Sequence, residues 1–75
     1  MPHIIVKLWP GKSENQKRKL AEEITHSVMR TLQYGEESVS VAFEVIEARN
    51  WAAEVYRTHT VGHEDNLYKK PGYTM

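Results

Sequence analysis

A proline occupies the second position of this 75-residue chain, where it opens an apolar run that reads as a strand. If Met1 is removed, Pro2 becomes the chain terminus and its nitrogen becomes a secondary amine, unlike the amide nitrogen of an internal proline. An α-amino group titrates near a pKa of ~8, and burial or a neighbouring cation lowers that pKa towards neutrality. Such an amine is an effective proton shuttle, so Pro2 is a candidate general base. The position alone is no signature, because proline is a common residue.

A second candidate is Lys12, in the segment Gly11-Lys12-Ser13 that links the first strand to a predicted helix. A complete phosphate-binding loop would need a glycine five residues before Gly11, but Val6 stands there, so we reject a nucleotide site. A helix N-terminus still offers free N–H groups and a partial positive charge, to which Lys12 adds a full charge. We expect this segment to bind a carboxylate. The alternative is that Lys12 is an ordinary solvated loop lysine.

Other polar and aromatic residues give weaker signals. His59 and His63 are spaced as on one helix face, but neither a cysteine nor a third ligand completes a tetrahedral site, so no metal is expected. Glu44 and Glu47 lie near the end of the second predicted strand without an obvious partner. Trp51 could line a pocket, although an aromatic residue of a small chain more often belongs to the core.

Composition limits the class of protein. Ten basic and ten acidic residues give zero net charge, which argues against a nucleic-acid surface. The basic run 17–19 is matched by Glu22 and Glu23, so we expect a solvated helix face there. The sequence has no cysteine, no apolar run that could span a membrane and no visible signal peptide. One cytoplasmic domain over residues 1–75, without a membrane partner, is therefore expected.

The spacing of apolar residues predicts a βαβ unit in the first part of the chain. Residues 2–9 and 38–46 alternate as strands do, and a ladder of apolar residues four apart predicts a helix between them. Ser13 is the expected N-cap, with Gln16 completing a capping box, and the helix should run to about Gln33. The strands should be parallel, with a right-handed crossover.

The rest of the chain is less regular. Gly35 suits the position just past the long helix. Asn50 could cap a short helix that runs through Tyr56, and residues 58–62 read as a break. Residues 64–70 could form one or two helical turns, and residues 73–75 a terminal strand or arm.

One face of the predicted strand pair has no cover from the βαβ unit. Its apolar residues are Ile5, Trp9, Ala42 and Ile46. A two-stranded sheet with a bare apolar face is not stable alone, so a second copy of the chain is expected to cover it. The fold class is thus α/β, a two-layer βαβ subunit with short C-terminal helical segments, assembled as a homo-oligomer, most simply a dimer.

The same topology separates the two candidate groups. Parallel strands begin side by side, so Pro2 should lie near Ser38 and Ser40. Lys12 follows the other end of the first strand, roughly 25 Å away at about 3.3 Å per residue. Lys12 can meet the Pro2 of a partner whose first strand runs antiparallel beside it, so we expect an active site shared between chains.

Together these features resemble the 4-oxalocrotonate tautomerase family. The resemblance runs almost without gaps over residues 2–51, and the ending 69–75 is most similar to the dimeric phenylpyruvate-type branch. It implies small βαβ subunits, an amino-terminal proline as general base, and no cofactor. The residues that carry it are Pro2, Gly11-Lys12-Ser13, Ser38-Val39-Ser40-Val41 and Trp51.

Two positions depart from the family pattern. Where the 4-oxalocrotonate enzymes carry arginines that bind and polarise a dicarboxylate, this chain has Lys12 and Ser40. Lysine keeps the charge but loses the bidentate fork, and serine carries no charge. The resemblance therefore implies a substrate with one carboxylate and an apolar or aromatic tail, namely a 2-keto acid enol of arylpyruvate or 2-hydroxy-dienoate type.

The implied reaction is keto–enol tautomerisation. Pro2 takes a proton from the enol hydroxyl and returns one to carbon, while Lys12 of the partner holds the carboxylate. Ser40 or a backbone N–H steadies the developing oxyanion. The tail of the substrate packs near Trp51 and the region of Leu8 and Phe43.

Two alternatives stay open at the level of sequence. A related hydratase or dehalogenase would use Pro2 to add water to an unsaturated acid, with Glu44 or Glu47 turned inward to activate the water. A non-catalytic oligomeric ligand-binding module would keep the fold without the reaction. Removal of Met1 is required for any base chemistry, and a small second residue permits it, as the resemblance implies.

Overall fold

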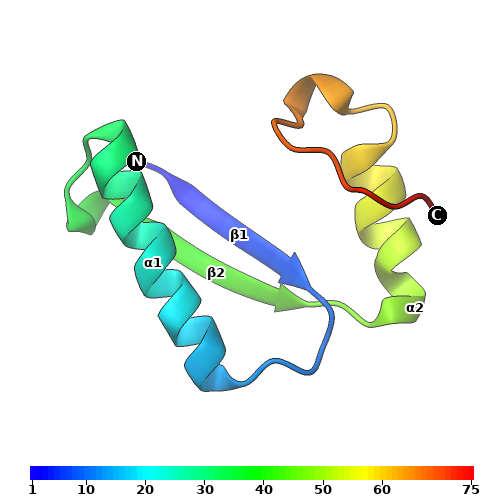
Figure 1. The fold of residues 1–75 in the computed structure, drawn as a ribbon, viewed down its shortest axis with the longest axis horizontal. Helices are drawn as coiled ribbons and strands as arrows, with labels where there is room; N and C mark the ends of the chain where they lie inside the picture. The colour runs from blue at the N-terminus through cyan, green and yellow to red at the C-terminus, as the bar shows by residue number, and fades with distance from the viewer.

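The computed structural model describes residues 1–75, and its first part is a βαβ unit. Strand β1 (His3–Leu8) is followed by helix α1 (Glu14–Leu32) and strand β2 (Ser40–Val45). The two strands are parallel and form one two-stranded sheet, with α1 packed along it (Figure 1). The predicted α/β class is confirmed.

The register of the sheet places Pro2 beside the start of β2. His3 lies opposite Ser40, and the pairing continues to Leu8 opposite Val45. The backbone N–H of Ser40 donates to the Pro2 carbonyl oxygen at 3.2 Å. The second strand is nevertheless shorter than the predicted 38–46, because residues Glu36–Ser38 form a 3₁₀ turn (η1) before it.

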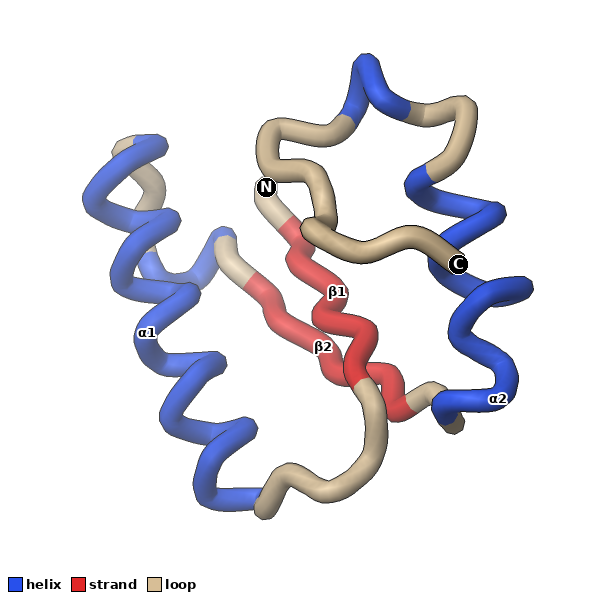
Figure 2. Tube along the Cα trace, turned by 45° about the vertical axis from the view of Figure 1, so that its right-hand side comes forward, coloured by secondary structure: helices blue, strands red, loops and turns tan.

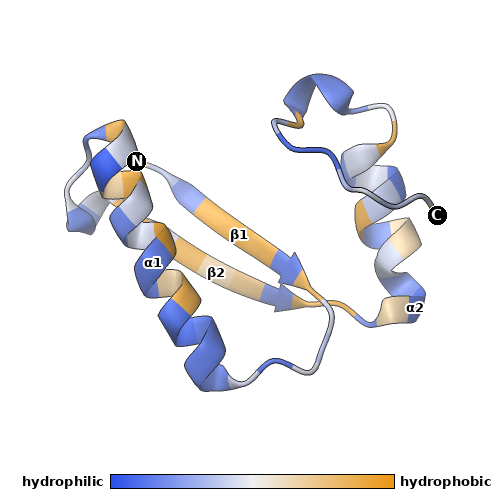
Figure 3. Ribbon diagram, in the orientation of Figure 1, coloured by the Kyte–Doolittle hydropathy of each residue, from blue (hydrophilic) through white to orange (hydrophobic).

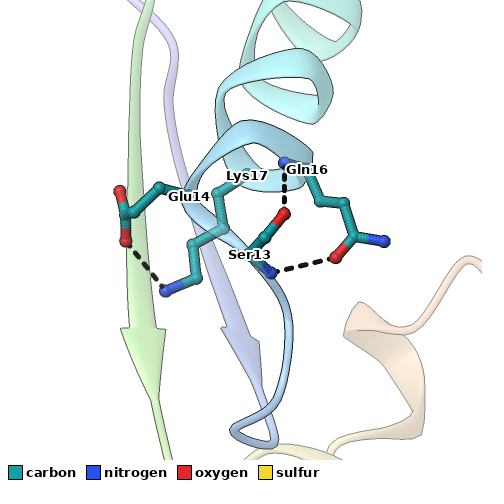
Figure 4. Close-up of polar contacts among 4 residues, drawn as sticks. All are labelled: Ser13, Glu14, Gln16 and Lys17. Atoms are coloured by element: carbon teal, nitrogen blue, oxygen red, sulfur yellow. Dashed lines mark hydrogen bonds and ion pairs between the residues drawn. The ribbon is translucent and has the colours of Figure 1, made fainter.

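The predicted capping box opens α1. The Ser13 hydroxyl accepts from the Gln16 N–H at 3.1 Å, and the Gln16 side chain accepts from the Ser13 N–H at 2.9 Å (Figure 4). A box of this kind satisfies two backbone donors reciprocally and fixes where the helix begins.

The other end of α1 differs from the prediction. Gln33 takes the left-handed conformation with φ 63°, whereas Gly35 has an ordinary φ of −80°. The Gln33 N–H donates to the Met29 carbonyl at 3.1 Å, and its side-chain amide donates to the Arg30 carbonyl at 3.3 Å. These two bonds satisfy carbonyl groups at the end of α1 and offset the strain of a left-handed glutamine.

The C-terminal helix is longer than predicted. Helix α2 (Ala48–Trp51) continues as a π-helical segment, η2 (Ala52–Thr60), so Asn50 lies inside the helix and caps nothing. The Thr58 hydroxyl donates to the Ala53 carbonyl at 2.6 Å, and the Val61 N–H donates to the Tyr56 carbonyl at 3.0 Å. The Val61 bond is the backbone π-helical pattern, five residues back, and the Thr58 side chain spans the same separation, so the helix continues through part of the predicted break.

After this helix the chain is mostly irregular. Residues Glu64–Asn66 form one 3₁₀ turn (η3), and residues 67–75 contain no strand. In Figures 1 and 2 this last segment folds back beside the C-terminal helix, while α1 lies on the other side of the strands. Of the two forms predicted for residues 73–75, a strand or an arm, the structure has the arm, which does not pair with the sheet. No helix of the structure has the length and hydropathy needed to cross a bilayer.

The single chain has almost no interior. Only Ile46 and Tyr56 are buried, with 7% and 9% of their surfaces exposed. The sheet carries its apolar residues in the middle of both strands (Figure 3). On the face away from α1, Ile5 is 48% exposed and Trp9 is 52% exposed. The C-terminal helix approaches this face but leaves open hollows beside Ile5, Lys7 and Ala53, so the face lacks a close-packed cover.

Candidate active site

Pro2 is half-buried at the open start of β1. Its carbonyl group is held by the Ser40 N–H, and the His3 ring nitrogen Nδ1 lies 2.6 Å from the Ser40 hydroxyl oxygen. With Met1 attached, the Pro2 nitrogen is an amide; after its removal the same nitrogen is a secondary amine on a fixed strand. The structure therefore brings Pro2, His3 and Ser40 together, as the parallel register requires.

Ser40 has two polar groups, and both already have a partner. Its N–H is bonded to Pro2, so that donor is not free for a substrate oxygen. Its hydroxyl oxygen lies 2.6 Å from His3 Nδ1, and when the His3 Nδ1–H donates to this oxygen, the hydroxyl proton stays free to donate to a substrate oxygen. Of these two groups of Ser40, the side chain is the one that its own chain leaves available as an oxyanion donor.

Lys12 stands at the rim of a hollow of ≈ 310 Å³ between the start of α1 and the sheet. Lys17, on the same rim, is paired with Glu14 at 3.4 Å (Figure 4). Lys12 has no carboxylate within 4.0 Å. The rim thus offers one free cation above an apolar floor, which suits a carboxylate joined to an apolar group. The floor is formed by Val6, Leu8, Leu20 and Phe43.

Trp51 lines a larger open pocket of ≈ 610 Å³ at the end of β1. Its ring meets Trp9 edge to face, with centroids 6.4 Å apart and planes at 82°. Its indole N–H donates to the Tyr73 hydroxyl at 2.9 Å. The other lining residues are Lys7, Leu8, Thr74 and Met75. The expectation that Trp51 lines a pocket therefore fits the structure, with Trp9 and Tyr73 as its neighbours.

Leu8 borders both the Lys12 hollow and the Trp51 pocket, so the two adjoin at the end of β1. Pro2 lies at the opposite end of that strand, roughly 20 Å away at about 3.3 Å per residue. A single chain therefore brings Lys12 and Trp51 to one place and Pro2 and Ser40 to another.

The remaining candidates lie outside both places. Glu44 pairs with Lys7 at 3.7 Å, and the Lys7 ammonium also lies 3.2 Å from His59 Nε2. His63 falls beyond the end of the C-terminal helix, so His59 and His63 do not share a helix face. Glu47 precedes α2 and caps it without a side-chain hydrogen bond. The structure contains no group of three or more potential metal-ligating side chains.

One carboxyl group has a perturbed pKa, and it lies away from these sites. Hydrogen bonds from the backbone N–H groups of Glu64 itself and of Gly62 hold the pKa of the Glu64 carboxyl below its ordinary value of 4.5. These bonds favour the ionised form and brace the turn after the C-terminal helix.

Sequence reasoning did not assign Trp9 or Tyr73 to a site, and it left open whether His3 lines the site of Pro2 or faces solvent. The alternation of β1 does place His3 and Trp9 on the open face, which is the signal that could have found them. Tyr73 meets Trp51 across 22 positions of sequence through an irregular segment. No periodic pattern predicts such a contact.

Known proteins match this chain from the first strand onward. The family model described as "Tautomerase enzyme" matches residues 2–60, so the match begins at Pro2. The chain belongs to the tautomerase family.

Named relatives agree over the full length of this tautomerase. Tautomerase PptA of Cronobacter sakazakii is 42% identical over 76 aligned positions that cover 100% of both chains. Tautomerase PptA of Escherichia coli is 38% identical with the same coverage. A probable tautomerase of Xylella fastidiosa is 37% identical, over 97% of this chain and 89% of its own.

Solved structures share the fold of this tautomerase. YwhB, described as a homologue of 4-oxalocrotonate tautomerase, is 35% identical with a TM-score of 0.60, over 61% of this chain and 75% of its own. TomN, a homologue in the tomaymycin biosynthetic pathway, is 32% identical with a TM-score of 0.64, over 67% and 77%. The resemblance drawn from the sequence is confirmed, and this tautomerase is an enzyme of the isomerase class rather than a non-catalytic module.

Proposed function

We propose that this tautomerase ketonises the enol of a 2-keto acid that carries one carboxylate, of arylpyruvate or 2-hydroxy-dienoate type, with the amino-terminal Pro2 as general base. The Pro2 nitrogen accepts the proton of the enol hydroxyl, the carbonyl forms, and the protonated amine returns a proton to the adjacent carbon. The observation that carries the proposal is that the family match begins at Pro2, whose backbone is held at the exposed start of β1. The reaction moves only protons and uses no cofactor.

The site in this proposal is shared between two chains. Lys12 and Trp51 lie at one end of β1 and Pro2 at the other, so a second copy with an antiparallel β1 brings the two groups together. The open face that carries Ile5 and Trp9 is the surface available for that contact. A homodimer is the smallest assembly that provides this contact between two chains. A larger oligomer could contain the same contact.

The proposed substrate follows from the charges at the site. Lys12 is a free cation, whereas Ser40 offers a hydroxyl where a second cation would be needed for a second carboxylate. One carboxylate is therefore anchored by Lys12, and the developing oxyanion accepts a hydrogen bond from Ser40. The apolar floor beside Lys12 and the pocket at Trp51 are the places for the tail.

The pairing of Glu44 speaks against the water-adding alternative in which Glu44 is the base. Glu44 is engaged by Lys7, and their register position lies four residues along the sheet from the His3–Ser40 pair. Glu47 lies beyond the far end of β2, at the start of α2. Glu44 is therefore not free to activate a water at Pro2, whereas the partner's Glu47 would approach Pro2 together with Trp51 in the shared site. The cytoplasmic location expected from the sequence stays a prediction.

The test is the ketonisation of phenylenolpyruvate by two preparations of the same chain. Intact mass spectrometry first identifies one preparation without Met1 and one in which Met1 is retained. We expect activity only in the preparation without Met1, because only that form carries a basic nitrogen at Pro2. Equal activity in both forms would contradict the proposal.

A further inference from the structure

The segment Tyr73–Met75, here called the C-terminal arm, lies beyond residues 2–60, which the family model matches. Residues 68–75 make a single hydrogen bond to the rest of the protein, from the Trp51 indole N–H to the Tyr73 hydroxyl. The Tyr73 ring also lies against the buried Tyr56, with centroids 5.8 Å apart. Tyr73 is thus the residue that fastens the arm to the protein.

The arm forms one wall of the Trp51 pocket. Trp9, directly after β1, also lines this pocket, and Trp51 contacts both Trp9 and Tyr73. The volume of ≈ 610 Å³ lies within the range of roughly 300–1,000 Å³ that is typical of small-molecule sites. Trp9 and Trp51 meet edge to face, an arrangement that leaves ring faces free to stack against a third ring.

We propose that the C-terminal arm builds the aryl-binding wall of the active site and that Tyr73 is its specificity-determining residue. This inference rests on the proposed function and narrows it to substrates with an aryl tail. A carboxylate held by Lys12 reaches the pocket across Leu8, which borders both places. The reacting carbon is then presented to Pro2 of the second copy.

Tyr73 acts in two ways in this arrangement. Its ring closes the pocket, and its hydroxyl accepts from Trp51 and fixes the angle of the indole ring. Loss of the ring should affect substrates that fill the pocket and spare those that do not reach it. A merely structural role would affect both kinds of substrate equally.

The first test measures binding and needs no turnover. The chain has two tryptophans, Trp9 and Trp51, and both line the pocket, so their fluorescence reports its occupancy. With trans-cinnamate as the probe, we expect quenching in the native protein and a dissociation constant raised about tenfold by Tyr73→Ala. Tyr73→Phe keeps the ring and loses the acceptor, so an increase of about threefold is expected.

Two control variants test whether the loss of cinnamate binding is specific to Tyr73. Tyr68 is 99% exposed in the same segment, and Tyr68→Ala should bind cinnamate as the native protein does. Leu20→Ala alters the floor of the Lys12 hollow and tests whether the aryl ring sits there instead. An effect of Leu20→Ala without one of Tyr73→Ala would overturn the proposal, and so would a native protein that does not bind cinnamate.

The second test compares two substrates. We expect Tyr73→Ala to lower kcat/KM for phenylenolpyruvate by at least about tenfold and to leave that for 2-hydroxypenta-2,4-dienoate within about twofold, since the dienoate has no ring. Equal losses for both substrates would overturn the aryl assignment. A native protein that binds cinnamate through Tyr73 but turns over neither substrate would support the pocket and refute the proposed function, so the two failures are distinguishable.

Discussion

The Nδ1 atom of His3 and the hydroxyl oxygen of Ser40 lie 2.6 Å apart, directly beside Pro2. The two residues face each other across the parallel strands, and the same pairing lets the Ser40 N–H hold the Pro2 carbonyl. One cross-strand pair therefore fixes the backbone of the proposed base and the orientation of the proposed oxyanion donor. This relationship makes separate predictions for the two side chains.

Ser40→Ala removes the hydroxyl and keeps the backbone bond to Pro2. We expect kcat/KM for phenylenolpyruvate to fall by about 10- to 100-fold, because a hydrogen bond to a charged oxygen is worth roughly 1.5–3 kcal/mol. Steady-state kinetics measure the loss, and most of it should appear in kcat. His3→Ala is the matched variant, since it leaves the hydroxyl in place and should cost less. A Ser40→Ala enzyme with native kinetics would exclude the hydroxyl from the mechanism.

Lys12→Ala removes the free cation at the rim of the α1 hollow. Its main effect should be a raised KM for an anionic enol, because the carboxylate is bound in both the ground state and the transition state. Lys12→Arg should retain most of the binding, since the charge is kept. Native kinetics in Lys12→Ala would show that this lysine is only solvated.

Folding and association should be coupled, because Ile46 and Tyr56 are the only buried residues of the single chain. Even roughly 800 Å² of interface per chain, at about 25 cal/mol per Å² of apolar area, contributes more than the usual net stability of a domain this small. We therefore expect the melting temperature to rise with protein concentration. Sedimentation that shows a folded, active monomer at micromolar concentration would refute the coupling.

A shared site also predicts complementation between two impaired variants, measured at a substrate concentration below the KM of Lys12→Ala. Hybrid dimers of Pro2→Ala and Lys12→Ala contain one site with both residues intact, so mixing the variants under exchanging conditions should restore part of the activity. Each variant alone, treated identically, is the control. Absence of recovery in hybrids shown to have formed would contradict a site that combines Pro2 of one chain with Lys12 of the other.

Local patterns predicted the βαβ half of the fold well. The capping box of Ser13 and Gln16 and the alternation of the strands depend on neighbours a few residues away, and the structure has them. The sequence predicted Gly35 as the residue just past the end of α1, but Gln33 takes the left-handed position there. Residue propensities do not predict this, because the conformation depends on the hydrogen bond from the Gln33 side chain to the Arg30 carbonyl.

The C-terminal third was less predictable. Thr58 reads as a helix breaker, yet its hydroxyl bonds the Ala53 carbonyl and helps to continue a π-helical segment. The contact between Trp51 and Tyr73 joins two segments through an irregular connection and depends on tertiary packing. The spacing of the strands correctly predicted that Pro2 lies beside Ser40 and at the opposite end of the first strand from Lys12. It did not predict that Tyr73–Met75 line the Trp51 pocket, which only the structure shows.

The central claim is that the Pro2 nitrogen is the base, and its most direct test is the rate of phenylenolpyruvate ketonisation by Pro2→Ala, in the form that lacks Met1, over a range of pH. The account predicts a kcat/KM at least ~10²-fold below that of the native enzyme, with a changed pH profile, because the secondary amine of a strand-held proline is replaced by a primary amine. A variant with the full native rate and an unchanged pH profile would contradict it.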